Sequence, residues 1–259
     1  MIGSECTVSP ETASLTFLTI FDLPLPHCST RLNSLSTSDV FKGYESTVFA
    51  YGQTGTGKTH TMEGDLSDPS NYGVIPRASQ AIFDNLRSPH YKNYDVTCSY
   101  LEIYNEDLGD LLSDGNNKVT MMEGKGGVVC RGLSEVSVSS SADVLSLMTR
   151  AQQKRHIGET KMNKQSSRSH CIFTIKVAAA VECPDGTFTL EGKLHMVDLA
   201  GSECAKSAGM EKTTGNEAAR ERERMSINRS LLTLGRVISI LKEQSQSKKP
   251  SKNVRIPYR

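Results

Sequence analysis

Eight consecutive residues at positions 52–59, Gly-Gln-Thr-Gly-Thr-Gly-Lys-Thr, have the types and the spacing of a phosphate-binding loop. They match the pattern G-x-x-x-x-G-K-[ST], in which glycines let backbone N–H groups curl around phosphate oxygens. In such a loop, Lys58 neutralises the terminal phosphates of a nucleotide, and the Thr59 hydroxyl is placed to coordinate Mg²⁺ at a helix N-terminus. The other loop residues expected to contact the nucleotide are Gly52, Gln53, Thr54, Gly55, Thr56 and Gly57. A chance glycine turn is the alternative, and it requires several fixed positions and a preceding strand to coincide.

A second candidate site residue stands at the end of an apolar run. Residues 195–201 (HMVDLAG) read as a strand followed by a D-x-x-G sequence formed by Asp198 and Gly201. In nucleotide-binding proteins this pattern brings a carboxylate to the metal ion and a backbone N–H to the γ-phosphate. Alone the pattern is weak, because Asp198 could be a turn residue at a strand end. The P-loop upstream favours the nucleotide-sensing role.

A polar, serine-rich segment lies between these two motifs, at residues 163–170 (NKQSSRSH). It is too polar for a protein core and precedes a β-branched strand. A serine-rich loop is unspecific by itself. In this place, its hydroxyl groups can reach a metal ion and an attacking water, and Arg168 can pair with Glu203, just after Gly201.

The rest of the sequence supplies strands and helices that can position the three motifs. Apolar, β-branched runs predict strands at 47–51, 94–104, 172–181 and 194–199, and helical spacing predicts helices at 74–87, 140–156 and 217–242. Glycines break residues 119–138 into a hairpin-like meander. Strands that alternate with helices predict an α/β fold, a P-loop NTPase-type three-layer sandwich whose mostly parallel or mixed central sheet is flanked by helices.

Composition excludes several classes of protein. The 259 residues carry 30 Lys+Arg and 29 Asp+Glu, a formal net charge of +1, which argues against a strongly basic nucleic-acid binder. The 7 cysteines are scattered and never spaced as C-x-x-C, so they predict a reduced, intracellular protein without a zinc site or a disulfide framework. No apolar run approaches the ~18–20 residues that span a bilayer. We therefore expect neither a nucleic-acid nor a membrane partner, and the cytosol or nucleus as compartment.

In their order along the chain, GQTGTGKT, NKQSSRSH and DLAGSE together resemble the kinesin motor domain. Supporting similarities are GYESTVFAYG at 43–52, LEIYNEDLGDLL at 101–112, SINRSLLTLGRVISIL at 226–241 and RIPYR at 255–259. The resemblance covers residues 41–259, and the phrases MNKQSSRSH and SLLTLGRVI are most similar to the bipolar mitotic-spindle class. It divides the chain into an unassigned, divergent segment at 1–37 and a partial motor domain at 38–259.

The resemblance implies a microtubule-stimulated ATPase that uses ATP and Mg²⁺ to move along or bind to microtubules, in the cytoplasm and on the cytoskeleton, the spindle included. The resemblance assigns catalytic roles to six residues, Ser166, Ser167, Arg168, Asp198, Gly201 and Glu203. Ser166 would position the lytic water, Ser167 would join Thr59 at the metal, and Asp198 would reach the metal through water. Arg168 and Glu203 would form an ion pair that closes over the phosphate. His60 would pack on the adenine, although a histidine that caps a helix turn is nearly as good a reading.

The resemblance also places the segment after DLAGSE against the acidic microtubule surface. The basic residues expected there are Lys206, Lys212, Arg220, Arg222, Arg224, Arg229 and Arg236, with Arg255 and Arg259. Any single one could instead belong to a solvated helix face, because Arg and Glu alternate at 220–224. Oligomerisation would depend on segments outside this sequence.

Two departures from the family pattern bear on activity. Residues 1–37 hold no R-x-R-P-like adenine segment and no convincing strand-to-helix pattern. The sequence stops at Arg259, where the family continues through another basic track helix, a central strand, a last helix and the neck linker. We therefore expect an incomplete motor in which Val48 and Phe49 lie beside an unpaired sheet edge, which invites aggregation. The alternative function is a catalytically impaired remnant that acts as a microtubule- or partner-binding module. A GTPase is disfavoured, because no [NT]-K-x-D motif follows the D-x-x-G sequence.

Overall fold

The computed structural model describes residues 13–19, 37–115, 118–124, 127–161, 167–183, 186–203 and 217–246. Within these ranges, the backbone alone is described at 13–19, 124, 127, 156–161, 183, 217–224 and 244–246.

A sheet of seven strands forms the centre of the described structure, in the order β1-β2-β9-β8-β3-β4 with β7 beside β3. Its strands are β1 (Ala13–Thr19), β2 (Glu45–Tyr51), β3 (Tyr91–Tyr104), β4 (Asp107–Asp110), β7 (Val136–Ser137), β8 (Ser169–Cys183) and β9 (Gly186–Asp198). β1, β2 and β9 are parallel neighbours, whereas β9–β8, β8–β3, β3–β4 and β3–β7 are antiparallel. The sheet is therefore mixed.

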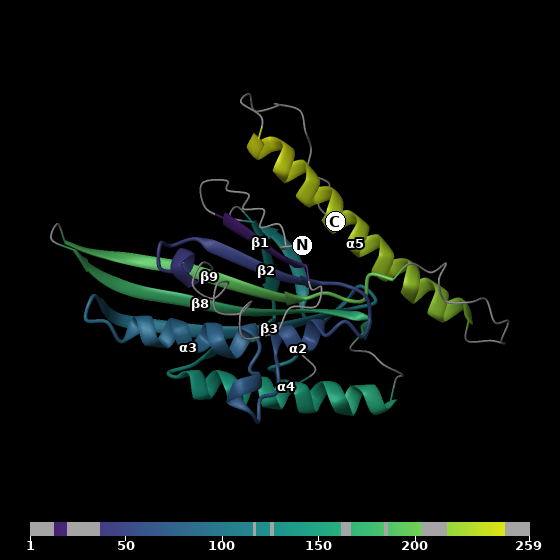
Figure 1. Cartoon of the computed structure of the whole chain (residues 1–259), viewed down its shortest axis with the longest axis horizontal. Coiled ribbons are helices and arrows are strands. Elements are labelled where there is room, and N and C mark those ends of the chain that lie inside the picture. Colours follow the sequence, from purple (N-terminus) through teal and green to yellow (C-terminus); the bar gives the residue numbers. More distant parts are fainter. Residues whose placement is uncertain are drawn as a thin grey trace.

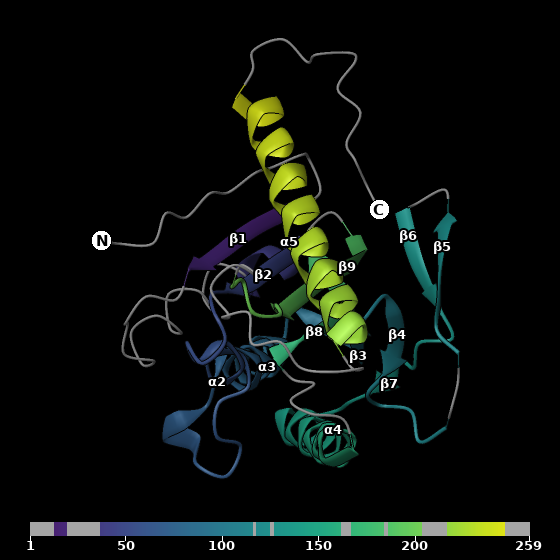
Figure 2. The ribbon, with the colours of Figure 1, turned by 90° about the vertical axis from the view of Figure 1, so that its right-hand side faces the viewer.

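Helices cover both faces of the sheet (Figures 1 and 2). α2 (Lys58–Met62), α3 (Val74–Leu86) and α4 (Ser141–Lys161) lie on one face, and α5 (Glu217–Gln246) crosses the strands on the other. The short 3-10 helix Pro69–Asn71 lies between α2 and α3. This arrangement confirms the three-layer α/β sandwich predicted from the sequence.

The two faces of the sheet are packed very differently. Between the sheet and α3 and α4 lies a large apolar core that includes Ile82, Met148 and Phe173, and the rings of Phe173 and Tyr100 meet edge to face with centroids 5.1 Å apart. On the α5 face a small cluster of Phe49, Val197 and Leu199 receives two leucines of the helix, Leu231 and Leu234. Among the residues whose side chains are described, α5 thus packs on the sheet through a much smaller apolar cluster than the helices opposite.

The first strand corrects two expectations from the sequence. Residues 13–19 form β1, which pairs in parallel with β2 from Ala13↔Glu45 to Thr19↔Tyr51, so a strand exists where none was expected. Because β9 pairs with the other side of β2, Val48 and Phe49 lie inside the sheet, at 1% and 9% exposure. The predicted unpaired edge beside the P-loop strand is therefore wrong, since β1 supplies the missing neighbour.

Other elements agree with the sequence in kind and differ in length. The meander contains a hairpin of β5 (Thr120–Gly124) and β6 (Gly127–Arg131). β8 and β9 extend well beyond the predicted strands, because they pair with each other as one long hairpin from Cys171↔Asp198 to Cys183↔Gly186. In the part of the chain that the structure describes, no helix has the length and apolar character needed to cross a membrane.

Candidate functional site

The P-loop connects the end of β2 to the start of α2. Gly55 and Gly57 have φ angles of +83° and +87°, a left-handed conformation that glycine adopts without the steric cost of a Cβ. Gly57 is also the N-cap of α2, so Lys58 and Thr59 are the first two residues of the helix. The glycines therefore turn the chain from strand to helix and place both side chains at the helix N-terminus.

Lys58 lies inside this loop rather than in solvent. Its side chain is buried, and its Nζ donates a hydrogen bond of 2.8 Å to the carbonyl oxygen of Gln53. Burial lowers the pKa of Lys58, whereas the negative charges of Asp198 and Glu203 raise it. The ammonium group is thus held at the loop with two carboxylates close enough to affect its charge.

Asp198 reaches the P-loop helix from the neighbouring strand. Because β9 pairs with β2 in the register Ala50↔Asp198, its carboxylate lies beside the start of the P-loop. The Thr59 hydroxyl donates a 2.5 Å hydrogen bond to Asp198 Oδ2, and Oδ1 is buried without a hydrogen-bond partner. Burial raises the pKa of Asp198, and the Thr59 hydrogen bond and the charge of Arg155 oppose this rise.

The segment after Asp198 joins the other two motifs. The Gly201 amide donates to the carbonyl oxygen of Ser167 at 3.0 Å, and the Ser202 amide donates to that of Gly52 at 3.1 Å. The Glu203 carboxylate accepts two hydrogen bonds from Thr54, at 3.0 Å from its amide and 2.5 Å from its hydroxyl. Burial raises the pKa of Glu203. The two hydrogen bonds from Thr54 and the charge of Lys58 lower it by more than burial raises it, so the pKa lies below its ordinary value. The three motifs therefore meet at one place.

The chemistry of this place fits a magnesium-bound nucleotide phosphate. A buried carboxylate oxygen of Asp198 without a partner and the hydroxyl of Thr59 are hard oxygen donors of the kind that Mg²⁺ takes. A Cβ added at Gly55 or Gly57 would meet nothing within 4 Å, so the space beside these backbone units is open. At Gly201 a Cβ would lie 2.3 Å from both Thr54 Oγ1 and Glu203 Oε2. A side chain at position 201 would therefore force Thr54 and Glu203 to shift from the positions in which they bond to each other.

The predicted roles of several residues expected at the site stay predictions. Ser166, Lys206, Lys212, Arg255 and Arg259 lie outside the described residues. Arg220, Arg222 and Arg224 lie on α5, where the backbone alone is described, and Arg229 and Arg236 are exposed on the same helix. His60 is exposed on α2. Arg168 is half-buried beside Ser167, and its ion pair with Glu203 stays a prediction.

Sequence reasoning missed a buried polar cluster behind the site. Glu63, which follows α2, is 3% exposed and accepts hydrogen bonds from the Tyr100 hydroxyl at 2.7 Å and from Gln152 at 2.6 Å. It also pairs at 3.0 Å with Arg155 of α4, whose side chain is 8% exposed and keeps one buried N–H group without a partner. The signal in the sequence is faint, since charged residues next to apolar helix positions usually face solvent. The cluster connects the end of the P-loop helix to α4 and places a positive charge near Asp198.

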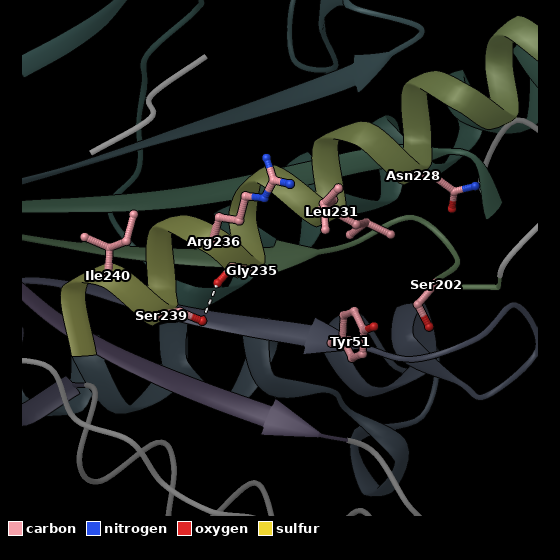
Figure 3. Close-up of a pocket in the computed structure, with 9 residues that line it drawn as sticks. Tyr51, Ser202, Asn228, Leu231, Gly235, Arg236, Ser239 and Ile240 are labelled. Carbon is pink, nitrogen blue, oxygen red and sulfur yellow. Dashed lines mark hydrogen bonds between the residues drawn. The ribbon is translucent and has the colours of Figure 1, made fainter. Parts of the chain in front are cut away.

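A groove runs between α5 and the sheet close to the D-x-x-G segment (Figure 3). Its volume is 810 Å³, and its lining includes Tyr51 at the end of β2, Ser202, and Leu231 and Gly235 of α5. Farther under the helix, a second cavity of 340 Å³ lies among Phe49, Ile172, Val197 and Leu234, with His170 and His195 at its wall. α5 therefore leaves unfilled volume beneath it.

Comparison with known proteins agrees with this geometry. A family model described as the kinesin motor domain matches residues 26–259, which is most of the chain. The chain belongs to the kinesin motor domain family. Its kinesin fold also matches a solved structure, described as that of a fast kinesin with implications for ATPase mechanism and interactions with microtubules. That match has a TM-score of 0.70 and 39% identity, and covers 84% of this chain and 60% of the other.

Similar curated proteins include kinesins from plants, insects and fungi. The chain is 44% identical over 237 residues to Kinesin-like protein KIN-5A of Arabidopsis thaliana and 44% identical over 234 residues to Klp61F of Drosophila melanogaster. Each alignment covers 85% of this chain and 21% of the relative, so the chain spans about a fifth of their length. Kinesin-like protein 3 of Schizosaccharomyces pombe is 40% identical over 264 residues, which cover 99% of this chain and 45% of that protein. The KIN-5 name is that of the bipolar class that the sequence resembles.

Proposed function

We propose that this chain is the nucleotide-hydrolysing part of a microtubule motor, with Mg-ATP as substrate. The observation that carries the proposal is the convergence of Lys58, Asp198 and Glu203 on one loop, held by the hydrogen bonds of Thr59 and Thr54. Phosphoryl transfer to water needs positioning and charge stabilisation more than a protein nucleophile, and these residues supply both.

The P-loop would hold the phosphates of ATP. The amide groups of the glycine-rich turn and the N-terminus of α2 favour anionic phosphate, and Lys58 adds a full positive charge beside them. Bound Mg²⁺ would neutralise charge on the phosphates. Thr59 and Ser167 are its proposed ligands, and Asp198 holds the Thr59 hydroxyl and offers its unpaired oxygen to the water shell of the metal.

The D-x-x-G segment would respond to the γ-phosphate. Its Gly201 amide is bonded to the Ser167 carbonyl, so a phosphate that draws this amide toward itself also changes the contact with the serine segment. Glu203 holds the segment against Thr54 of the P-loop, and Arg168 is proposed to exchange into this contact as the site closes. Ser166 is proposed to position the attacking water.

Track binding is proposed for α5 and the segments on either side of it. Arg229 and Arg236 are exposed on this helix, and Arg220, Arg222 and Arg224 belong to its first turns. A basic face on a chain of net charge +1 suits the acidic surface of the microtubule. The fast kinesin interacts with microtubules according to its description, which supports the same partner here. We accordingly propose a cytoplasmic, cytoskeletal location, including the spindle.

The alternative of a catalytically impaired remnant is not favoured. The match of the kinesin motor domain model to residues 26–259 and the similarity to the kinesin relatives support the motor instead. The intact hydrogen bonds from the P-loop to Asp198 and Glu203 argue in the same direction.

Binding and turnover of ATP test the proposal together. The chain should bind a fluorescent ATP analogue in the presence of Mg²⁺, and microtubules should increase the rate of phosphate release. Lys58→Ala should weaken nucleotide binding by at least tenfold, because it removes the charge that faces the phosphates. Lys42→Ala is the matched control, because it also removes one lysine charge, from a side chain that is 60% exposed. This variant should bind the nucleotide like the wild type. A wild-type chain without measurable nucleotide binding, or a Lys58 variant that binds equally well, would contradict the proposed function.

A further inference from the structure

The hairpin of β5 and β6 carries apolar side chains on both of its faces. It is a separate two-stranded sheet in the described part of the chain, set apart from the central sheet (Figure 2). Successive residues of a strand point to opposite faces, so Met121 and Met122 lie on different faces of the hairpin. Their exposed fractions are 54% and 49%, and those of Val128 and Val129 are 61% and 58%. Both faces of the hairpin therefore expose apolar side chains to solvent.

Each methionine of the hairpin pairs across the two strands with a residue on its own face. Met121 lies opposite Cys130, and Met122 lies opposite Val129. Residues directly opposite each other in an antiparallel pair have Cβ atoms about 4.5–5.5 Å apart, and contacts between such residues stabilise a sheet. A hairpin of two strands is only marginally stable by itself. The two methionine pairs therefore contribute to a small structure that the loss of either pair would weaken.

The base of the hairpin is fixed to the rest of the protein. The Asp110 carboxylate, at the end of β4, accepts hydrogen bonds from amides on both sides of the hairpin, at 2.9 Å from Leu112 and 2.8 Å from Ser134. The ammonium group of Lys154 on α4 donates a hydrogen bond of 2.8 Å to the Asp110 carbonyl oxygen. These contacts lie outside β5 and β6, so a chemical change on the strands of the hairpin does not remove them.

The other methionines whose side chains are described differ from this pair. Three are buried in the large core at 0–1% exposure, namely Met62, Met148 and Met196. Met225 is 61% exposed, but it lies on α5 and has no place in a strand pair. A dissolved oxidant reaches a sulfur atom only where solvent does. Among the described methionines, those of the hairpin therefore combine an accessible sulfur with a part in pairing two strands.

The thiol of Cys130 competes poorly with the two thioethers for an oxidant. Its side chain is half-buried, and burial raises the pKa of the thiol. The thiolate is the nucleophilic form of cysteine, so a raised pKa lowers the reactive fraction near pH 7. A thioether has no proton to lose, and its sulfur lone pairs are available at any pH in this range. An oxidant that reaches the hairpin therefore reacts with methionine before it reacts with the cysteine opposite Met121.

We propose that Met121 and Met122 are oxidation sites, at which hydrogen peroxide converts each thioether to a sulfoxide and thereby weakens the hairpin. A sulfur lone pair attacks one oxygen of the peroxide, the O–O bond breaks, and that oxygen stays on sulfur. Its proton joins the departing hydroxide to form water, so sulfur is oxidised by two electrons and the peroxide is reduced. A sulfoxide is polar, which disfavours the apolar pairs with Cys130 and Val129. Methionine sulfoxide reductases reverse the reaction, so the change is reversible.

Mass spectrometry after limited treatment with hydrogen peroxide tests the two sites. Met121 and Met122 lie on one tryptic peptide, residues 119–125, whose fragment ions separate the two positions. Each should gain one oxygen at least about tenfold faster than the three core methionines, because only the hairpin sulfurs are open to the oxidant. Met225 gives the rate of an exposed thioether in the same sample. The proposal is wrong if the hairpin methionines react no faster than those of the core, or if Cys130 is oxidised first.

Hydrogen exchange of the backbone amides tests the consequence for the hairpin. In the wild-type chain, peroxide should accelerate exchange in β5 and β6 at least about threefold and leave exchange in the central sheet unchanged. The double variant Met121→Leu with Met122→Leu keeps apolar side chains of similar volume and has no sulfur there to oxidise. It should fold like the wild type and show no acceleration. Met225→Leu is the matched control, because it removes an exposed methionine elsewhere, and it should keep the response of the hairpin.

Repair of the sulfoxides completes the test. Incubation with methionine sulfoxide reductases for both epimers should remove the added oxygen and restore slow exchange in β5 and β6. Unchanged exchange in wild-type protein whose hairpin methionines are fully oxidised would overturn the proposal. Equal acceleration in the double leucine variant would overturn it as well. These measurements need neither nucleotide nor microtubules, so their outcome is independent of the proposed function.

Discussion

Thr54 and Glu203 are joined by two hydrogen bonds, from the amide and the hydroxyl of the threonine to the two carboxylate oxygens, although 149 positions separate them in sequence. The carboxylate thereby closes the D-x-x-G segment onto the P-loop. Gly201 lies directly against this contact. The pair adds a side-chain link to the backbone hydrogen bond from the Ser202 amide to the Gly52 carbonyl, which joins the same two segments.

Loss of this contact should separate ATP binding from hydrolysis. Glu203→Ala removes both hydrogen bonds, and Gly201→Ala forces a Cβ into the space that Thr54 and Glu203 share. We expect both variants to bind ATP with affinity within about threefold of the wild type, because Lys58 and the P-loop glycines are unchanged. Hydrolysis should fall by two orders of magnitude or more, since a positioning loss of this kind costs about 10²-fold. Unchanged microtubule-stimulated turnover in Glu203→Ala would contradict the assigned role.

The basic residues of α5 should control affinity for the track. Neutralisation of Arg220, Arg222, Arg224 and Arg229 together should raise the microtubule concentration for half-maximal ATPase stimulation at least tenfold and leave basal hydrolysis nearly unchanged. Wild-type binding should weaken steeply with salt, because exposed charges are screened over ~8–10 Å near physiological ionic strength. Cosedimentation with microtubules over a salt series measures both effects.

A second quadruple variant distinguishes position from net charge. The side chains of Lys42, Arg87, Lys92 and Arg150 are exposed and pair with exposed or half-buried acids that do not belong to α5, so their removal costs little stability. This variant should bind microtubules more tightly than the α5 variant at every salt concentration. Equal cosedimentation of the two variants would show that net charge, and not the α5 face, sets the affinity.

His170 should make stability fall on mild acidification. Its pKa is about 4 in the folded protein and about 6.5 when exposed, so between these values the unfolded chain binds more protons. Its contribution is therefore complete above pH 6.5 and is lost as pH falls toward 4, by at most about 3–4 kcal/mol. Denaturant unfolding at a series of pH values should show a shallower slope in this window for His170→Gln. His195, whose pKa burial also lowers, adds a slope in the same direction that both proteins share.

Removal of one partner of the buried ion pair between Arg155 and Glu63 should lower the free energy of unfolding. Arg155→Met leaves the Glu63 carboxylate buried without its counter-charge, and we expect a loss of about 3–5 kcal/mol in the free energy of unfolding. The double variant with Glu63→Gln should recover part of this loss, because Gln removes the stranded charge and can still bond to Tyr100. Equal stability of the single and double variants would contradict the assigned ion pair.

Contiguous motifs were predictable from the sequence, and contacts between distant elements were not. The P-loop carries its own turn chemistry in glycines at fixed spacing, so its place between β2 and α2 could be predicted from eight residues. β1 could not be predicted in this way, because a short strand of mixed residues is stabilised by pairing with β2, and the local sequence does not indicate which strand it will pair with. The Arg155–Glu63 and His170–Ser230 contacts join residues 92 and 60 positions apart, and they became visible only once the helices had been placed against the sheet.

The register Glu45↔Lys193 between β2 and β9 also governs how the protein is made. The strand that feeds the P-loop leaves the ribosome 148 residues before the strand that carries Asp198 begins to pair with it. At typical synthesis rates of ~5–20 residues per second, this delay lasts roughly 7–30 seconds. During that time Val48 and Phe49 lack β9, and Asp198 has not yet been synthesised. The P-loop and Asp198 therefore cannot come together in the nascent chain until β9 has emerged, and until then one edge of β2 lacks its partner strand.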